Sequence, residues 1–224
     1  MDERQERGLA TLRLIRGPAA EAPLVALNDL APDLVRFAIG FAYGEVLSRP
    51  TLDLKTRQLC TVAALGALGT APFQLQWHVT GALELGWQPA EVVDAVMFTG
   101  ALTASPAVAR SMGVVRESFE ARGMGVDSLR VVEQAAACWQ QGVPWENRAA
   151  LDTRTQCLIA VAALTAVANA PDRLEGRIRE ALRVEVPRRE VIEVIEQMAI
   201  YAGFPAALNG VAAARAAFGP DGLT

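Results

Sequence analysis

Apolar residues recur at helical spacing along most of the chain, and prolines separate the segments that carry them. Leu52 to Leu68 places Leu59, Val62 and Leu65 on one face behind an acidic first turn, which predicts an amphipathic helix. Ala31 to Ser48 predicts a second, longer helix. No segment shows the period-two alternation of a half-buried strand, so the pattern predicts an all-α fold. Proline occupies the first turn of the other helices that we expect, which begin near Pro72, Pro89, Pro106, Pro171, Pro187 and Pro205.

The chain contains an internal repeat of 99 residues. Under this shift Leu52-Asp53 falls on Leu151-Asp152 and Val62–Leu65 falls on Val161–Leu164, and roughly a third of positions 52 to 109 are identical. Two copies of one helical unit are therefore predicted, as tandem domains over residues 1–122 and 123–224. The glycine-containing segment 121–127 is the expected connector, and we expect the two halves to pack on each other with approximate two-fold symmetry.

Composition and charge exclude several classes of function. Twenty-one basic and 25 acidic residues give a net charge of −4, which argues against a nucleic-acid or anionic-membrane partner. The longest apolar run, Cys157–Ala168, is too short to span a bilayer, and the charged segment Met1–Arg7 is not a secretory signal. Cys60, Cys138 and Cys157 have no metal-ligand spacing. We therefore expect a cytoplasmic protein without a metal site.

A single histidine, His78, limits the available chemistry, because any mechanism that uses imidazole must use this residue. Gln74 lies four residues earlier on the helix from Pro72, so the two side chains are expected on one face. Two interpretations follow from the residues alone: a hydrogen-bonded histidine at a helix interface, or a functional acid/base. The second copy has Arg177 at the matching position, so the role of His78 is not duplicated.

Several short motifs occur in an order and at distances that are similar to the carboxymuconolactone decarboxylase family. The resemblance covers about residues 4 to 118, and the second half resembles the shared core of the broader superfamily, which includes AhpD-like alkylhydroperoxidases. The whole chain therefore resembles a tandem of two such domains. The segments that carry the resemblance are Glu6–Ala10, Phe41–Pro50, Leu52–Leu59, Leu75–His78, Leu151–Ala163 and Tyr201–Ala206.

This resemblance implies a cofactor-free enzyme that removes CO₂ from an unsaturated lactone acid in aromatic-acid degradation. His78 matches the family's histidine and would be the general acid/base. Arg57 and Arg49 match arginines of the motif and would hold a substrate carboxylate. Glu45 would orient one of these arginines, and Gln74 would hydrogen-bond the imidazole or a substrate oxygen. The expected partner is thus a small carboxylated, lactone-type molecule.

The sequence raises two other functions, of which one stays a real alternative and the other is disfavoured. The family has a glutamate where this chain has Gln74, and an amide is no general base, so a non-catalytic helical scaffold or ligand-binding paralogue is the alternative. The peroxidase branch carries Cys-x-x-Cys-His, but Gln74 and Trp77 stand at its cysteine positions, which argues against thiol peroxidase activity. Single-domain relatives commonly form rings of six, so we expect the tandem chain to form a homo-oligomer, a trimer that builds a pseudo-hexamer.

Overall fold

The computed structural model describes residues 2–145, 151–220 and 222, and within these ranges it contains helices and no strands. The sequence prediction of an all-α fold is confirmed. The elements in chain order are α1 Glu3–Arg16, α2 Ala22–Val25, α3 Pro32–Phe37, the π-helix η1 Ala38–Leu47, α4 Leu54–Leu68, α5 Pro72–Glu84, α6 Pro89–Thr103, α7 Val108–Ala121, α8 Val126–Gln141, α9 Thr153–Val167, α10 Pro171–Arg183 and α11 Arg188–Phe218.

Local chemistry explains why the repeated helices start where they do. The carboxylate of Asp53 accepts a hydrogen bond from the backbone N–H of Thr56 at 2.8 Å, and Asp152 accepts one from Thr155 at 2.6 Å. Each aspartate therefore satisfies an N–H group that has no partner within the helix. Prolines in the first turn open α5 and α10. The caps recur 99 residues apart, as the repeat predicts.

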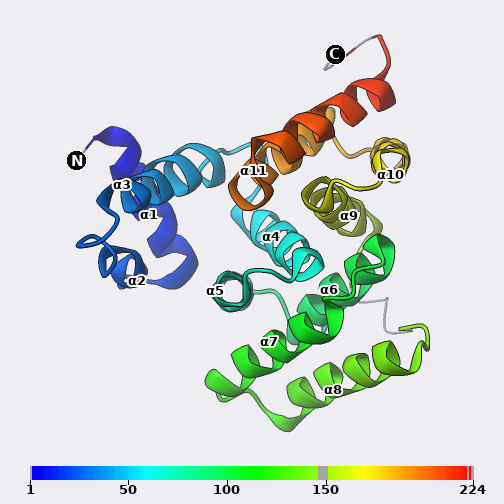
Figure 1. The fold of residues 1–224 in the computed structure, drawn as a ribbon, viewed down its shortest axis with the longest axis horizontal. Helices are drawn as coiled ribbons and strands as arrows, with labels where there is room; N and C mark the ends of the chain where they lie inside the picture. The colour runs from blue at the N-terminus through cyan, green and yellow to red at the C-terminus, as the bar shows by residue number, and fades with distance from the viewer. Residues whose placement is uncertain (1, 146–150, 221, 223–224) are drawn as a thin grey trace.

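The two copies share one continuous core with α4 and α9 at its centre (Figure 1). The first copy's α6 packs on α9, and α11 of the second copy packs on α4 in return. This reciprocal packing is what approximate two-fold symmetry predicts. As a result, α11, which is far from α4 and α5 in the sequence, packs on α4 and places a side chain beside α5.

The helix that leads into the second copy, α8, packs on α6 and α7 of the first copy (Figure 1). In the same way η1, which precedes the first copy's α4, contacts α11. The expected connector at 121–127 contains the end of α7 and the start of α8. The predicted boundary between residues 122 and 123 separates the two repeat copies in the sequence. In the structure, helices from either side of this boundary pack on each other.

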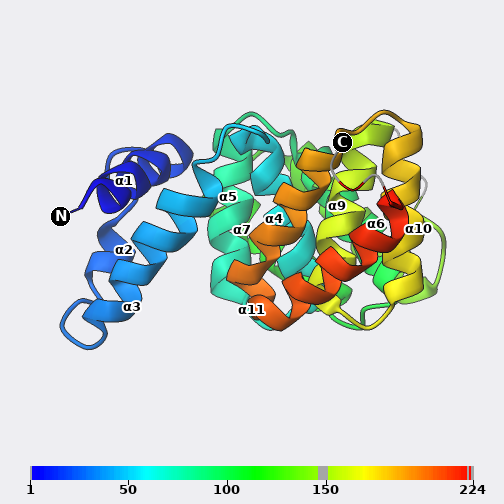
Figure 2. The same cartoon turned by 90° about the horizontal axis from the view of Figure 1, so that it is seen from above.

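Residues 2–47 form an arm that projects from the body (Figures 1 and 2). Within it α1 packs closely on η1, because Gly8 and Gly44 lie at the contact. A Cβ atom on Gly44 would lie 2.2 Å from the carbonyl oxygen of Arg4, and one on Gly8 would lie 2.0 Å from that of Ile39. The predicted helix over residues 31–48 is present, but from residue 38 it has π-helical hydrogen bonding.

Helix α11 combines two segments that the sequence predicts separately. Its backbone leaves helical geometry at Gly203, where φ is 82°, two residues before Pro205. By length and composition α11 is the single described helix that could cross a membrane, with 44% of its apolar window buried in the molecule. A core helix passes the same test, and α11 packs on α4, α9 and α10.

Candidate functional site

The single histidine lies where α5, α4 and α11 meet. His78 on α5 is 3% exposed. Its Nδ1 atom lies 2.8 Å from Oε1 of Gln58 on α4, and its Nε2 atom lies 3.5 Å from the hydroxyl of Tyr201 on α11. The imidazole and phenol rings are edge to face, with centroids 5.4 Å apart. Both ring nitrogens therefore face a polar partner, one from each copy.

Burial sets the protonation states of this pair. Burial, followed by the positive charge of Arg16, lowers the pKa of His78 to about 3, so the imidazole is neutral at physiological pH. With the Gln58 oxygen as acceptor, the single proton is on Nδ1 and the lone pair is on Nε2. Burial also raises the pKa of Tyr201, so its hydroxyl keeps its proton and donates toward Nε2.

Two hydrogen-bond donors close to His78 have no partner in the protein. They are Nη1 of Arg16, from α1, and Nε2 of Gln58, and both atoms are buried. A Cβ atom on Gly81 would lie 3.1 Å from Oε1 of Gln58 and 3.8 Å from Cδ of Arg16, so these two side chains meet beside α5. Buried polar atoms are normally satisfied. Unpartnered donors at this point suit a bound oxygen anion.

A cavity of about 410 Å³ lies beside this cluster, between α1, α5 and α7. Arg16 and Arg122 supply two cations, and the guanidinium of Arg16 lies 4.6 Å from the ring centroid of Trp77. The hydroxyls of Thr80 and Ser118 are also in the wall, which does not include the imidazole of His78. The cavity can therefore bind a small anion with an apolar, planar part.

Arg57, expected from the sequence to hold a carboxylate, is fully buried and bonded within the protein. Its guanidinium donates to the backbone carbonyls of Leu52 and Arg49, to Oε1 of Gln197 at 3.3 Å, and to the carboxylate of Glu193 at 2.7 Å. Gln197 and Glu193 belong to α11. The structure thus places Arg57 at the joint between α4 and α11, where it holds the helix that carries Tyr201.

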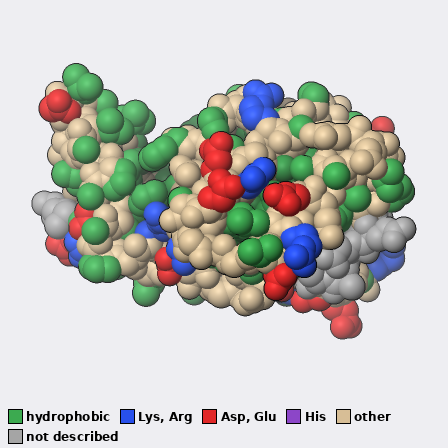
Figure 3. Space-filling view, turned by 90° about the horizontal axis from the view of Figure 1, so that it is seen from below, with side chains coloured by type: hydrophobic (Ala, Val, Ile, Leu, Met, Phe, Trp, Pro, Cys, Tyr) green, Lys and Arg blue, Asp and Glu red, His purple; other side chains and the backbone are tan. Residues whose placement is uncertain are grey.

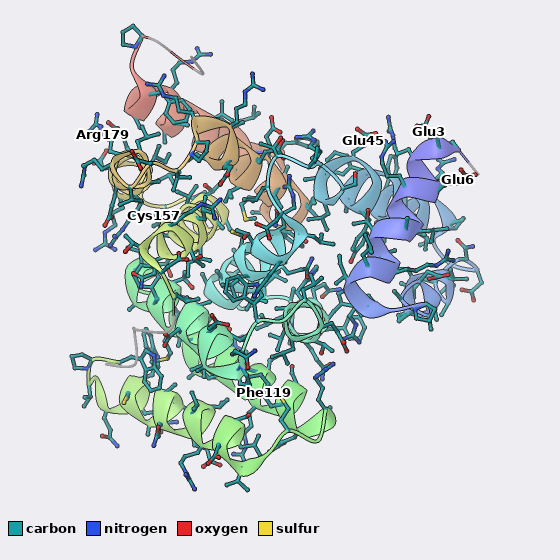
Figure 4. All side chains as sticks on the ribbon, turned by 180° about the vertical axis from the view of Figure 1, so that it is seen from behind. Glu3, Glu6, Glu45, Phe119, Cys157 and Arg179 are labelled. Carbon is teal, nitrogen blue, oxygen red and sulfur yellow. The ribbon has the colours of Figure 1, made fainter. Side chains whose placement is uncertain are left out.

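Two further residues predicted from the sequence, Arg49 and Glu45, form ion pairs within the protein. Arg49 forms ion pairs with Glu193 and Glu196 of α11. Glu45, on η1 near α1 in Figure 4, pairs with Arg4 at 2.9 Å and Arg7 at 3.2 Å.

Gln74 is exposed on α5, and the amide that contacts His78 is that of Gln58. The structure brings Arg57 and Arg49 together, and Gln74 lies apart from them. The carboxylate of Glu45 interacts electrostatically with Arg49 but forms its ion pairs with Arg4 and Arg7. Sequence reasoning did not single out Gln58, Tyr201 or Arg16, although Gln58 adjoins Arg57 in the matched motif and Tyr201 begins the Tyr-Ala-Gly-Phe-Pro segment.

Two of the three cysteines, Cys60 and Cys157, lie in buried environments that disfavour thiolate chemistry. Burial raises the pKa of Cys60 to about 12 and that of Cys157 to about 11. A thiol peroxidase needs a thiolate with a lowered pKa and a resolving partner. Cys157, labelled in Figure 4, occupies the second-copy position that matches Gln58. Within the described residues, no three His, Cys, Asp or Glu side chains are grouped as metal ligands.

Comparison with known proteins links both halves of the chain to one family. The model of the carboxymuconolactone decarboxylase family matches twice, over residues 32–117 and 132–216. A protein of Acinetobacter baylyi named 4-carboxymuconolactone decarboxylase is 30% identical over 129 residues, which are 57% of this chain and 96% of that protein. An uncharacterised 15.0 kDa protein of Paracoccus denitrificans is 27% identical over 126 residues, 56% of this chain and 92% of the relative. Each relative thus corresponds to about half of the chain.

Proposed function

The chain belongs to the carboxymuconolactone decarboxylase family, and we propose that it is a cofactor-independent decarboxylase of a small carboxylated lactone in aromatic-acid breakdown. The observation that carries this proposal is the neutral, buried His78 held between Gln58 and Tyr201. The name of the Acinetobacter relative supports the choice of substrate class.

Proton transfer at His78 meets the chemical need of such a reaction. When the C–C bond to the carboxylate breaks, CO₂ leaves and its electron pair delocalises into the unsaturated lactone as a dienolate. A carbon of the dienolate then takes up one proton, so that substrate carboxylate and one proton become product and CO₂. His78 holds its lone pair on Nε2, so in the course of the reaction it would take up one proton from solvent there and pass one proton to this carbon, returning to its neutral form.

The unpartnered donors beside His78 suit the charge that develops. We propose that Nη1 of Arg16 and Nε2 of Gln58 stabilise the dienolate oxygen, since fixed donors in a buried site act strongly on a developing oxyanion. Arg122, in the wall of the same cavity, would receive a second carboxylate in place of Glu84, with which it pairs at 2.6 Å. Arg57 would contribute by holding α11, and with it Tyr201, against α4.

Arg49 and Glu45 would contribute in the same indirect way, through α11 and α1 respectively. A direct contact of Gln74 with substrate stays a prediction. Restoring the family's acid with Gln74→Glu tests it, because a gain of decarboxylation would show that position 74 acts in the reaction.

The decisive experiment is an assay of the full chain with 4-carboxymuconolactone, following CO₂ release and loss of the lactone acid by NMR. His78→Asn should lower kcat/KM about a hundredfold or more, the usual contribution of an acid/base. Arg16→Gln should lower it as well, whereas Arg13→Gln, an exposed arginine on the same helix paired with Glu21, should leave it unchanged. No CO₂ release, or full activity in His78→Asn, would refute the proposal.

A non-catalytic paralogue is the second candidate, and one observation favours it. His78 is 3% exposed, and the neighbouring cavity is walled by Trp77 and not by His78. A ligand could therefore bind to Arg16 and Arg122 without reaching the imidazole. Saturable binding of the lactone acid without CO₂ release, unchanged in His78→Asn, would establish this function in place of the first.

We also propose that the protein acts in the cytoplasm as a trimer of two-domain chains. Large apolar side chains are exposed on the arm and beyond the kink of α11, and Figure 3 shows such side chains gathered on the projecting arm. These side chains include Leu30, Leu34, Phe37, Phe204 and Leu208. Light scattering should give three times the chain mass of 23.9 kDa, and a stable monomer would contradict the trimer.

A further inference from the structure

A cavity of about 520 Å³ lies between α6 of the first copy and α8 and α10 of the second, where Arg177 stands in the place that His78 has in the first copy. Arg177, which stands 99 residues after His78, is part of its wall. Two more wall residues are Phe98, the counterpart of Gln197, which bonds Arg57 and Thr61, and Leu102, the counterpart of Tyr201, which faces His78. The cavity is therefore the pseudo-symmetric equivalent of the His78 site, with each polar group replaced.

The helices that cover α5 and its counterpart α10 differ between the two copies. In the first copy α1 packs on α5, and Ile15 contacts α5 at Gly81. In the second copy α10, the counterpart of α5, packs on α9 and α11. The counterpart of Gly81 is Glu180, a half-buried acidic residue beside Arg177. The face of α10 that corresponds to the α1-covered face of α5 thus has no closely packed helix on it within the described part of the chain.

We propose that this cavity is a second, non-catalytic binding site that takes an aromatic carboxylate. Its size lies within the usual range for small-molecule sites, and its wall is apolar with a single cation. Phe98, Trp139 and Trp145 offer flat aromatic faces, which suit a planar ring. Trp145 is held in place because its indole N–H donates to the carboxylate of Asp94 at 2.5 Å.

Arg177 is placed to receive the carboxylate. Its guanidinium lies 5.8 Å from the ring centroid of Phe98, which keeps the cation against the apolar wall. It also pairs with Glu180 at 2.5 Å, three residues along α10, but both side chains are about one-third exposed. Exposed pairs of this kind are weak. A ligand carboxylate that is shielded from water inside the cavity can therefore displace Glu180.

The site cannot repeat the acid/base chemistry proposed for the first copy. A guanidinium does not release its proton in the physiological range, and Leu102 offers no hydroxyl where the other half has Tyr201. The second site therefore binds an anion and leaves it unchanged. The inference does not rest on the proposed decarboxylase function, since it needs only the cavity and Arg177.

Isothermal titration calorimetry of the full chain tests this site, with 2-naphthoate as the probe and 2-naphthalenemethanol as its neutral analogue. Arg177→Gln should weaken 2-naphthoate binding at least tenfold and leave the neutral analogue unchanged. Arg179→Gln is the matched control, because Arg179 lies on the same helix, points away from the body in Figure 4 and pairs with Glu175. It should bind both molecules as the parent protein does.

Two further variants should change the affinity for 2-naphthoate in opposite directions. Glu180→Gln removes the competing carboxylate and should tighten 2-naphthoate binding about threefold, a change opposite to that of Arg177→Gln. Ala101→Trp fills the cavity from its rim and should abolish binding of both molecules.

Three outcomes would overturn the inference. They are no saturable binding of 2-naphthoate by the parent protein at millimolar concentration, equal binding by Arg177→Gln, and loss of binding in His78→Asn, which would place the ligand in the first copy. If Arg177→Gln fails to fold, Arg177→Lys keeps the charge and loses the bidentate geometry. It should then weaken 2-naphthoate severalfold and leave the neutral analogue unaffected, and equal binding of 2-naphthoate by this variant and the parent would again overturn the site.

Discussion

The buried ion pair between Arg57 and Glu193 predicts a large and specific loss of stability in Glu193→Gln. This substitution keeps the shape of the side chain and removes the negative charge that lies 2.7 Å from a guanidinium with no exposed surface. Deleting one partner of a buried pair typically costs about 3–5 kcal/mol. The remaining amide oxygen and the backbone carbonyls that Arg57 contacts favour the lower end, about 3 kcal/mol.

Glu196→Gln is the matched control, because Glu196 is on the same helix and pairs with Arg49 in a largely exposed contact. Removing such a pair should cost less than about 1 kcal/mol. Urea unfolding followed by circular dichroism at pH 7 measures both variants. The expected difference of about 2 kcal/mol should persist in 0.5 M NaCl, since salt screens buried pairs little.

Equal stabilities of Glu193→Gln and Glu196→Gln would refute this reasoning. In that case Arg57 would not depend on α11 for its charge balance, and the proposed role of Arg57 in holding Tyr201 would fail as well. A melting temperature lowered by about 6–12 °C in Glu193→Gln corresponds to the expected 3 kcal/mol for a chain of this size.

Three further predictions concern the histidine, the arm and the thiols. The folded-state pKa of His78, about 3, lies below its unfolded value of 6.5, so stability is complete above pH 6.5 and falls as the pH is lowered; relative to His78→Asn, about 2 kcal/mol should be lost by pH 5. The single imidazole resonance in NMR should accordingly not titrate near pH 6.5. Gly44→Ala, whose Cβ meets the Arg4 carbonyl, should destabilise the protein by about 1–3 kcal/mol in urea. Gly113→Ala, with no atom within 4 Å, should stabilise it by up to about 1 kcal/mol. Because burial raises the pKa of Cys60 to about 12, a thiol reagent at pH 8 should spare it and react with half-buried Cys138; persistence of the fast reaction in Cys138→Ser would contradict this.

The parts of the fold that depend on neighbouring residues could be predicted from the sequence. Asp53 caps α4 three residues away, and proline fixes the first turn of α5, so both helix starts are encoded locally. The 99-residue repeat led to the expectation of approximate two-fold packing, with which the reciprocal contacts of α6 with α9 and of α11 with α4 agree. His78 was singled out because it is the one histidine, which needs no structural knowledge.

The partners of His78 could not be predicted in this way, because they lie far from it in the sequence. Gln58 is 20 residues away and Tyr201 is 123 residues away. Their approach depends on how α11 packs against α4, which is a property of the whole core. Arg16 reaches the site only because the arm packs on α5. The i to i+4 spacing predicted that Gln74 and His78 share one face, but Gln74 is exposed while His78 is buried, and Gln58 supplies the amide that contacts the imidazole.

Because α11 supplies Glu193, Gln197 and Tyr201, the His78 site has an order of assembly. During synthesis, α4 and α5 leave the ribosome more than a hundred residues before their partners exist. Until then Arg57 has no counter-charge from Glu193, and His78 has no phenol beside it. Contacts of such high sequence separation form late and slowly. The candidate site is therefore complete only when α11 docks, so a chain terminated before α11 lacks both the counter-charge of Arg57 and the phenol beside His78.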